Sequence, residues 1–265
     1  MFSENDVQVL VVTTQKNDGL ELYRRMNLQT DAVISNQGNE VSYKENILNG
    51  KKIQFVSNSH KGVGKNRNMA LAYADRQICI LADDDMHYQD SYAKKIVKYF
   101  NKIPKADIII FNIETIGHET RARKMIRKTH RVYKWNCLKY GAARIAVRLD
   151  RLKYANVHFS TLFGGGAKYS AGEDSLFLIE CLNKGLKIYA VPILIADIKQ
   201  EESSWFNGYD KKYFYDKGVL YKQISKYGCY AFCVLDIIRH RKLYKSNLSM
   251  IQIYKTMLEG MKARI

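Results

Sequence analysis

Short apolar runs alternate with longer, helix-like segments up to residue 112 of the chain. The runs are rich in β-branched residues and end in polar turns, a pattern typical of buried strands. The segments between them repeat apolar side chains every three or four positions, which predicts amphipathic helices. The predicted strands are residues 7–12, 32–35, 53–56, 78–82 and 108–112, and the predicted helices are residues 18–29, 64–73 and 90–101.

Strands that alternate with helices predict an α/β fold, in which a mostly parallel sheet is flanked by helices on both faces. In such a sheet, ligands bind beyond the carboxyl ends of the strands. Four polar residues follow or end these predicted strands: Thr13, Asn36, Ser57 and Asp83. The sequence therefore predicts a binding site at that edge of the sheet.

The second half of the chain is less regular. Its pattern predicts a strand at residues 144–149, a flexible loop at Gly164, Gly165 and Gly166, a helix at residues 174–184 that Gly185 ends, and a strand at residues 188–195. From about Tyr209 onward, the chain is expected to be helical, aromatic and basic.

The net charge of +17 is concentrated in the second half of the chain. Twelve Lys or Arg residues and one acid lie between Arg121 and Lys153, and a further twelve, against three acids, lie between Lys211 and Ile265. Such an excess indicates an anionic partner, which could be nucleic acid, a membrane surface or a phosphorylated ligand.

The five cysteines are an odd number, and no leader-like segment precedes the first predicted strand. Both features favour a reducing, cytoplasmic compartment. Cys229 and Cys233 lie four positions apart, but two thiols without a nearby His or Cys pair do not make a zinc site. No apolar stretch reaches the roughly 18 residues that a membrane-spanning helix needs, so any membrane contact is expected to be peripheral.

Three consecutive carboxylates, Asp83, Asp84 and Asp85, follow a predicted buried strand. Adjacent carboxylates repel one another unless a cation neutralises them. Mg²⁺ or Mn²⁺ takes oxygen ligands from one or two carboxylates together with substrate phosphates, and offsets the charge of a diphosphate leaving group. The alternative is a solvated acidic turn that caps the helix expected near Asp90.

A second acidic site, Glu173 and Asp174, opens a predicted helix directly after Gly172. A carboxylate in this place can act as the general base for an acceptor hydroxyl, and the preceding glycines let a substrate approach the backbone closely. The alternative is helix capping alone, because carboxylates are favoured at helix N-termini.

A basic segment with two glycines, residues 61–68, opens another predicted helix. Its backbone amides, together with Lys65 and Arg67, would favour a phosphate group. The spacing is not that of a P-loop, and an ordinary basic surface turn is an equal alternative.

In combination and in this order, these features resemble family 2 glycosyltransferases with the GT-A fold, over roughly residues 7–191. Two departures from the family pattern are that Asn36-Gln37 stands where the family has an acidic pair, and that no proline ends the first strand. The motifs that carry the resemblance are the first strand with Thr13-Thr14, the turn Val33-Ile34-Ser35-Asn36-Gln37-Gly38-Asn39, the segment Gly64-Lys65-Asn66-Arg67-Asn68-Met69-Ala70-Leu71-Ala72, the segment Ile80-Leu81-Ala82-Asp83-Asp84-Asp85 and the pair Glu173-Asp174.

The resemblance implies a Mn²⁺- or Mg²⁺-dependent enzyme that moves a sugar, with inversion, from a nucleotide-diphosphate donor, expected to be UDP-linked, to an acceptor hydroxyl. It implies that Asp174 is the base, that Glu173 holds the acceptor or orients its loop, and that Asp85 or Asp84 binds the metal. Implied donor contacts are Thr13 and Asn36 to the nucleoside, Arg67 to the base or phosphates, Asp83 to the ribose or sugar, and further Thr14, Asn17, Lys65 and Asp84, with Gly165 and Gly166 beside the acceptor.

The same resemblance implies a GT-A catalytic domain at residues 1–205, with a donor half (1–115) and an acceptor half (116–205), and a helical, basic extension at residues 206–265. The acceptor is expected to be a saccharide or lipid-linked saccharide in cell-surface or capsular polysaccharide assembly. Because aromatic residues from Trp205 and Phe206 onward lie beside lysines, we expect peripheral attachment to the inner, anionic face of the cell membrane through Lys211 to Arg264.

Two other functions fit part of the sequence. A nucleotidyltransferase acting on sugar phosphates also uses carboxylate-bound metal, but residues 13–17 lack the Gly-rich, basic signature that such enzymes carry near the first strand. A non-enzymatic, nucleic-acid-binding protein would account for the charge but not for the acidic residues at Asp83–Asp85 and Glu173-Asp174, so no nucleic-acid partner is expected.

Overall fold

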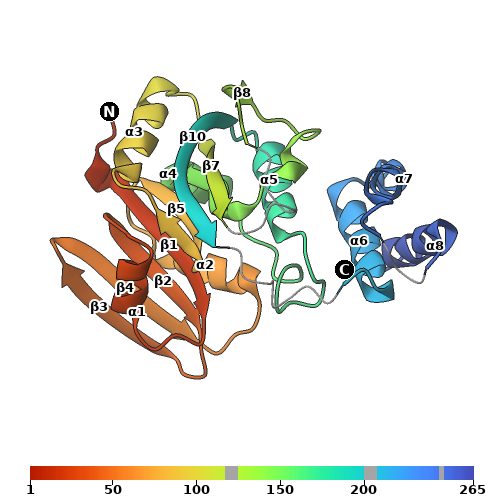
Figure 1. Ribbon diagram of the computed structural model, residues 1–265, viewed down its shortest axis with the longest axis horizontal. Coiled ribbons are helices and arrows are strands. Elements are labelled where there is room, and N and C mark those ends of the chain that lie inside the picture. Colours follow the sequence, from red (N-terminus) through yellow and green to blue (C-terminus); the bar gives the residue numbers. More distant parts are fainter. Residues whose placement is uncertain (117–124, 200–207, 245–247) are drawn as a thin grey trace.

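The structure, a computed structural model, describes residues 1–116, 125–199, 208–244 and 248–265. Within these ranges, ten strands form one mixed sheet in the order β3-β4-β2-β1-β5-β9-β7-β10-β6, and β8 pairs with β10 (Figure 1). The strands are β1 Val7–Thr14, β2 Asp31–Gln37, β3 Ser42–Leu48, β4 Lys51–Asn58, β5 Ile78–Asp83, β6 Met86–Tyr88, β7 Ile108–Ile116, β8 His130–Arg131, β9 Ile145–Arg148 and β10 Ile188–Lys199. The helices are α1 Gly19–Arg25, α2 Val63–Tyr73, α3 Tyr92–Lys102, α4 Leu149–Ala155, α5 Glu173–Asn183, α6 Lys211–Ile224, α7 Cys229–His240 and α8 Met250–Met261, with short 3₁₀ turns at Glu4–Asp6, Cys137–Lys139 and Ala142–Arg144.

Strands β4, β2, β1 and β5 are parallel neighbours, and β10 is parallel to β7. The short strand β9 runs antiparallel between β5 and β7, so β7 has the same direction as β5. In the register of the sheet, Thr13 lies opposite Asn36, Asn36 opposite Ser57, and Val12 opposite Asp83. The polar residues at the predicted strand ends therefore meet at one edge, as expected.

Alternate side chains of the central strands point into two separate cores, one on each face of the sheet. Val9 and Val11 of β1 belong to the core that α1 and α3 cover, and Leu10 belongs to the core that α2, α4 and α5 cover. The predicted α/β fold, with helices on both faces of the sheet, is confirmed.

The β3–β4 hairpin is absent from the sequence prediction, which recognised only the second of its strands. Asn49 and Gly50 join the paired residues Leu48 and Lys51, with φ angles of +51° and +72°. An Asn-Gly pair with both residues at positive φ is the preferred two-residue hairpin turn. The turn signal was therefore present in the sequence and was missed.

Two predicted elements are shorter than expected. The helix expected to reach residue 29 ends at Arg25, because Asn27 adopts a left-handed conformation at φ +53°. The strand expected at residues 144–149 ends at Arg148, because Leu149 begins α4 and buries one face of that helix together with Leu152.

Helices α6, α7 and α8 pack around a core of their own, on the side of α5 away from the sheet (Figure 1). None of the described helices is long and apolar enough to cross a membrane. All five cysteines are free and buried, as expected for small apolar side chains. Trp205, Phe206 and the expected boundary between residues 205 and 206 lie outside the described residues.

Candidate active site

A network of buried amides and hydroxyls forms the carboxyl edge of β1, β2 and β4. The Asn66 side chain, from the first turn of α2, donates through Nδ2 to the carbonyl oxygens of Thr13 and Ser35, each at 3.0 Å. Asn36 Nδ2 donates to Ser57 Oγ at 3.1 Å. These bonds fix the edge before any ligand arrives. Sequence reasoning did not single out Asn66 for a role, because nothing local to it indicates that it bridges two strands.

Asn36 also holds the loop that follows β1. Its Oδ1 accepts from the backbone N–H of Lys16, and its Nδ2 donates to the carbonyl oxygen of Lys16, both at 3.0 Å. Thr14, the last residue of β1, and Asn17 of that loop are exposed, and Lys65 is exposed at the start of α2. The predicted donor residues of these segments therefore lie on neighbouring connections at one edge of the sheet.

The three aspartates have three different environments. Asp83 is the last residue of β5, and its Oδ1 accepts from Arg67 Nη2 at 3.0 Å. Asp84 accepts through Oδ2 from the Thr13 hydroxyl at 2.5 Å, and Arg25 Nη2 donates to its carbonyl oxygen at 2.9 Å. Asp85 completes the tight turn into β6 with its side chain exposed. The acidic run is thus a β-turn at the site edge, and does not cap the helix near Asp90.

Arg67 joins the aspartate run to the second acidic site. Its guanidinium is buried, with the side chain 6% exposed, and bonds Asp83 at 3.0 Å, Glu173 at 3.0 Å and Asp174 at 2.6 Å. Burial by itself would lower the pKa of Arg67, but the charges of the three carboxylates outweigh it and raise the pKa above its ordinary value. Arg67, expected as a donor contact, therefore has both terminal nitrogens committed to carboxylates.

Asp174 is held from two sides at the N-terminus of α5. Its Oδ1 accepts from Arg67, and its Oδ2 accepts from the backbone N–H of Ala142 at 2.9 Å. Gly141, next to this contact, has no room for a side chain without pressing on the carboxylate, since an added Cβ would lie 3.3 Å from Asp174 Oδ2. The carboxylate orientation is therefore set by contacts from residues distant in the sequence.

Glu173 lies beside Asp174 and is more deeply buried. Its Oε1 accepts from Arg67 at 3.0 Å, and its Oε2 accepts from the backbone N–H of Gly172 at 3.2 Å. Burial, together with the charge of Asp174, raises the pKa of Glu173 to about 7. The glycine loop, Gly164 to Gly166, passes over the Glu173 side chain at Gly164, whose φ is +103°. A Cβ added to Gly164 would lie 2.7 Å from the carboxyl carbon of Glu173, so only glycine fits there.

An open hollow of about 410 Å³ lies in front of this acidic pair. Its walls come from the 137–141 turn, the glycine loop and the start of α5. Gly165 belongs to the lining, and its carbonyl oxygen accepts from Val63 N–H at 2.9 Å, which ties the loop to α2; Gly166 is exposed next to it. The full lining is Leu138, Lys139, Tyr140, Gly141, Gly165, Ser170, Ala171, Gly172, Glu173, Asp174 and Ser175.

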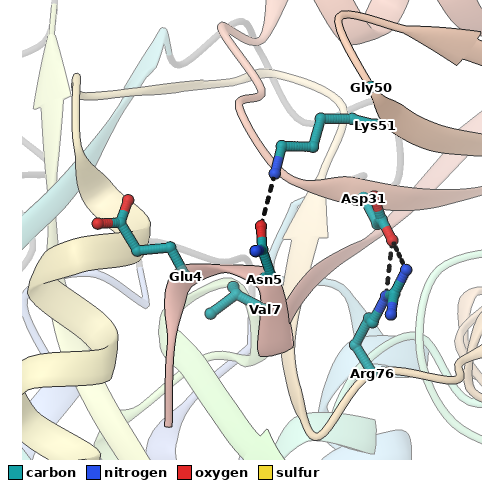
Figure 2. Close-up of a pocket in the computed structure, with 7 residues that line it drawn as sticks. All are labelled: Glu4, Asn5, Val7, Asp31, Gly50, Lys51 and Arg76. Atoms are coloured by element: carbon teal, nitrogen blue, oxygen red, sulfur yellow. Dashed lines mark hydrogen bonds and ion pairs between the residues drawn. The ribbon is translucent and has the colours of Figure 1, made fainter.

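A second hollow lies at the opposite edge of the sheet, where β1, β2 and β4 begin (Figure 2). Its charged and polar groups bond to one another: Arg76 pairs with Asp31 at 2.6 Å, and Lys51 donates to Asn5 at 3.1 Å. In α/β sheets, ligands bind at the carboxyl edge. The Arg76–Asp31 and Lys51–Asn5 pairs lie at the other edge, where the strands begin, and the two members of each pair bond to each other. We therefore place the site at the Asp83–Asp174 edge.

The raised pKa of Glu173 makes the stability of the protein depend on pH. The folded-state pKa of about 7 lies above the ordinary value of 4.5, so the folded chain holds more protons between these values. Stability is then lost as pH rises from 4.5 through about 7. Glu173→Gln has the size and neutral charge of the protonated glutamate. We therefore expect the free energy of unfolding of the variant, relative to the parent protein, to rise with pH across this window by up to about 3 kcal/mol.

Thermal unfolding at pH 4.5 and pH 8 measures this effect, with Glu180→Gln as control, since that side chain is exposed on the same helix. A Glu173→Gln difference that is the same at both pH values would show that Glu173 ionises normally in the folded protein.

The chain matches the family model described as Glycosyl transferase family 2 over residues 35–167, half of its 265 residues. The matched range includes Arg67, the three aspartates and Gly165, but ends before Glu173. No curated protein matches the sequence at a significant level.

Solved structures of S. aureus TarS share the fold of the chain. Residues 1–349 of TarS in complex with UDP-GlcNAc superpose with a TM-score of 0.63 at 13% identity, over 91% of this chain and 74% of that one. The complex with UDP gives a TM-score of 0.61 at 13% identity, over 91% and 73% of the two chains. A longer TarS structure gives 0.62 at 13% identity, over 91% of this chain and 44% of that one.

This likeness confirms the GT-A fold expected from the sequence, with its central sheet between layers of helices. The family match covers the strand-end aspartates and the helix that supplies Arg67. The chain is a glycosyltransferase and belongs to glycosyl transferase family 2.

Proposed function

We propose that the chain transfers a hexosyl or hexosaminyl group, with inversion, from a nucleotide-diphosphate donor to an acceptor hydroxyl. The observation that carries this proposal is the buried Arg67, which links Asp83 at the strand ends to Glu173 and Asp174 at the hollow. Two halves of a transfer site, one for a donor and one for an acceptor, are joined in this way.

The donor half comprises the strand ends and the segments that follow them. A nucleoside would lie against Thr13, Thr14, Asn17 and Asn36, with Lys65, Arg67, Asp83 and Asp84 near its phosphates and sugar. The TarS structures that share the fold were solved with UDP-GlcNAc and with UDP, which supports a UDP-linked donor. Asn36 in place of a carboxylate changes the hydrogen-bond pattern offered to the base, because an amide both donates and accepts.

The residues at the β5–β6 turn fit a Mn²⁺ or Mg²⁺ ion. In the part of the chain that the structure describes, no group of three or more His, Cys, Asp or Glu side chains is arranged to hold a metal. A cation that one or two carboxylates hold together with substrate phosphates needs no such group. Asp85, exposed at the turn, and Asp84 would be the ligands, and the bound ion would offset charge on the departing diphosphate.

The acceptor half works through the acidic pair. The acceptor hydroxyl oxygen would attack the anomeric carbon as the bond from that carbon to the diphosphate oxygen breaks, and the hydroxyl proton would pass to Asp174. Each Asp174 oxygen already accepts one bond but has a second lone pair for the hydroxyl. Glu173, Gly165 and Gly166 would hold the acceptor in the hollow. A single displacement of this kind inverts the anomeric centre.

The acceptor that we propose is a saccharide, free or lipid-linked, in the assembly of a cell-surface or capsular polysaccharide. Peripheral attachment at the cytoplasmic face of the cell membrane, through the basic part from Lys211 to Arg264, belongs to the same proposal.

A screen of nucleotide sugars for binding and hydrolysis, with Mn²⁺ and with a chelator, tests the donor and the metal together. We expect one donor to be bound and hydrolysed in the presence of Mn²⁺, with a rate lower by about 100-fold in the chelator and in the Asp84→Asn, Asp85→Asn double variant. Asp150→Asn is the control, because this exposed carboxylate follows Arg148, which lies opposite Ile78 at the start of β5, the end away from Asp83.

Equal hydrolysis with Mn²⁺ and with chelator would contradict the metal assignment alone. Failure to bind any nucleotide sugar, with folding confirmed by a cooperative melt, would contradict the donor assignment.

A further inference from the structure

Helix α7 turns an apolar face to solvent. Its buried residues, among them Cys229, Cys233 and Ile237, face α6 and α8. The opposite face repeats large apolar side chains at steps of three and four residues, which places them side by side on a helix. Together with Tyr227, two residues before the helix, they are Tyr230, Val234, Leu235 and Ile238, and the five side chains are exposed by 83%, 52%, 42%, 56% and 62% in chain order.

The exposed charges around this face are basic. Between Lys217 and Leu258, Asp236 is the only acid of the sequence, and its side chain is 6% exposed and bonded to Lys217 at 2.8 Å. Both ends of the helix are flanked by exposed cations: Lys226 before it, and Arg239, Arg241 and Lys242 at its end and just beyond. An apolar stripe therefore lies between positive ends, and residues 217–258 bring no exposed carboxylate to it.

We propose that this α7 face docks on the surface of an anionic lipid bilayer, which assigns a surface to the membrane attachment proposed above and rests on that proposal. A helix with an apolar face, cations beside it and tyrosines at its edge suits the boundary between lipid headgroups and acyl chains. Anionic headgroups complement the cations. A second copy of the chain fits less well, because a two-fold contact of two α7 faces would bring like-charged residues together.

Helix α6 connects this face to the acceptor hollow. Asp216 of α6 is buried, and its Oδ2 accepts from the backbone N–H of Ser170 at 2.9 Å. Leu220, one turn later, packs so closely on Gly172 that an added Cβ would lie 2.5 Å from its Cδ1. Ser170 and Gly172 line the hollow. Docking of α7 would thus hold the hollow next to the bilayer, and this step rests on the proposed acceptor role of that hollow.

Sedimentation with vesicles tests the docking face in the full chain. We expect binding to vesicles of phosphatidylcholine with about 30 mol% phosphatidylglycerol, and about ten-fold weaker binding to phosphatidylcholine alone. The double variant Leu235→Glu, Ile238→Glu should lose binding to the anionic vesicles by about ten-fold or more. Val41→Glu, Ile47→Glu, at apolar side chains 82% and 68% exposed near the β3 edge, should bind as the parent does.

Donor hydrolysis in the absence of vesicles separates this proposal from the proposed sugar transfer, because none of the four substituted residues belongs to the proposed donor or acceptor half and both double variants should keep the parent rate. Absence of binding to the anionic vesicles at low salt, or binding that the α7 variant retains, would overturn the docking proposal. A dimer in solution that the α7 variant dissociates, without vesicle binding by the parent, would also overturn it and assign the face to a second copy.

Discussion

Replacing Asp174 with asparagine is expected to lower the rate of sugar transfer by about 10³-fold while changing donor affinity by less than about three-fold. Asparagine has the size of aspartate, and its amide oxygen can still accept from Ala142 N–H, but its NH₂ group can neither accept from Arg67 nor take up the acceptor proton. The donor half is undisturbed, because Arg67 still reaches Asp83 at the strand ends. Steady-state kinetics of transfer and calorimetric titration of the donor measure the two quantities.

Glu180→Gln is the matched control for Asp174→Asn. It lies on the same helix, is exposed, and pairs with Lys184 at 4.0 Å on the protein surface, so transfer should stay near the parent rate. If Asp174→Asn kept transfer within about three-fold of the parent, Asp174 could not be the base, and Glu173, with its pKa near 7, would be the next group to test.

The strands and the edge at which their polar ends meet could be predicted from the sequence, because both follow from local patterns. Mainly apolar runs of four to six residues identify β1, β4 and β5, and the carboxyl ends of adjacent parallel strands share an edge of the sheet. The predicted positions Thr13, Asn36, Ser57 and Asp83 therefore lie where they were expected, in adjacent rows of the sheet.

The partners of these residues could not be predicted, because they depend on long-range contacts. Arg67 lies 106 and 107 positions from Glu173 and Asp174, and only the folded chain brings its guanidinium within hydrogen-bond distance of both. A basic helix start was consistent with a phosphate site, and nothing local distinguishes that role from a buried ion pair. The hydrogen bond from Ala142 N–H to Asp174 could not be predicted for the same reason, because every residue except proline has a backbone N–H and the sequence does not show where it points.

The structure suggests where on the surface the partner of the basic C-terminal part would bind. The excess of Lys and Arg after residue 211 predicted an anionic partner without saying where it binds. The proposed docking face of α7 would place that partner at one surface, and the contacts of Asp216 and Leu220 connect this face with the loop beside Glu173 and Asp174. Sequence periodicity alone would have assigned the apolar residues of α7 to a core, since exposure cannot be read from a pattern.

Replacing Arg67 with methionine is expected to destabilise the fold by about 3–5 kcal/mol and to abolish transfer. Methionine fills a similar volume but leaves Asp83, Glu173 and Asp174 as three neighbouring carboxylates without their shared cation. The cost arises because the site is buried, with 6% of the Arg67 side chain exposed, so water cannot replace the guanidinium. Chemical denaturation at pH 8 measures the loss, and the loss should shrink toward pH 4.5, where protonation relieves the repulsion.

Two further variants separate the role of Arg67 from that of an ordinary ion pair. Arg67→Lys keeps the charge but not the fork of two nitrogens, so we expect an intermediate stability with transfer still lowered, because one ammonium cannot hold Asp83 and the acidic pair in the same geometry. Arg76→Met removes a guanidinium that is 43% exposed from Asp31, which is 8% exposed and keeps the backbone N–H of Lys52 as a donor at 2.9 Å, so it should cost about 1–2 kcal/mol with transfer unchanged. Should Arg67→Met be no more costly than Arg76→Met, or should Arg67→Lys transfer sugar at the parent rate, Arg67 would not be the group that positions the acidic pair.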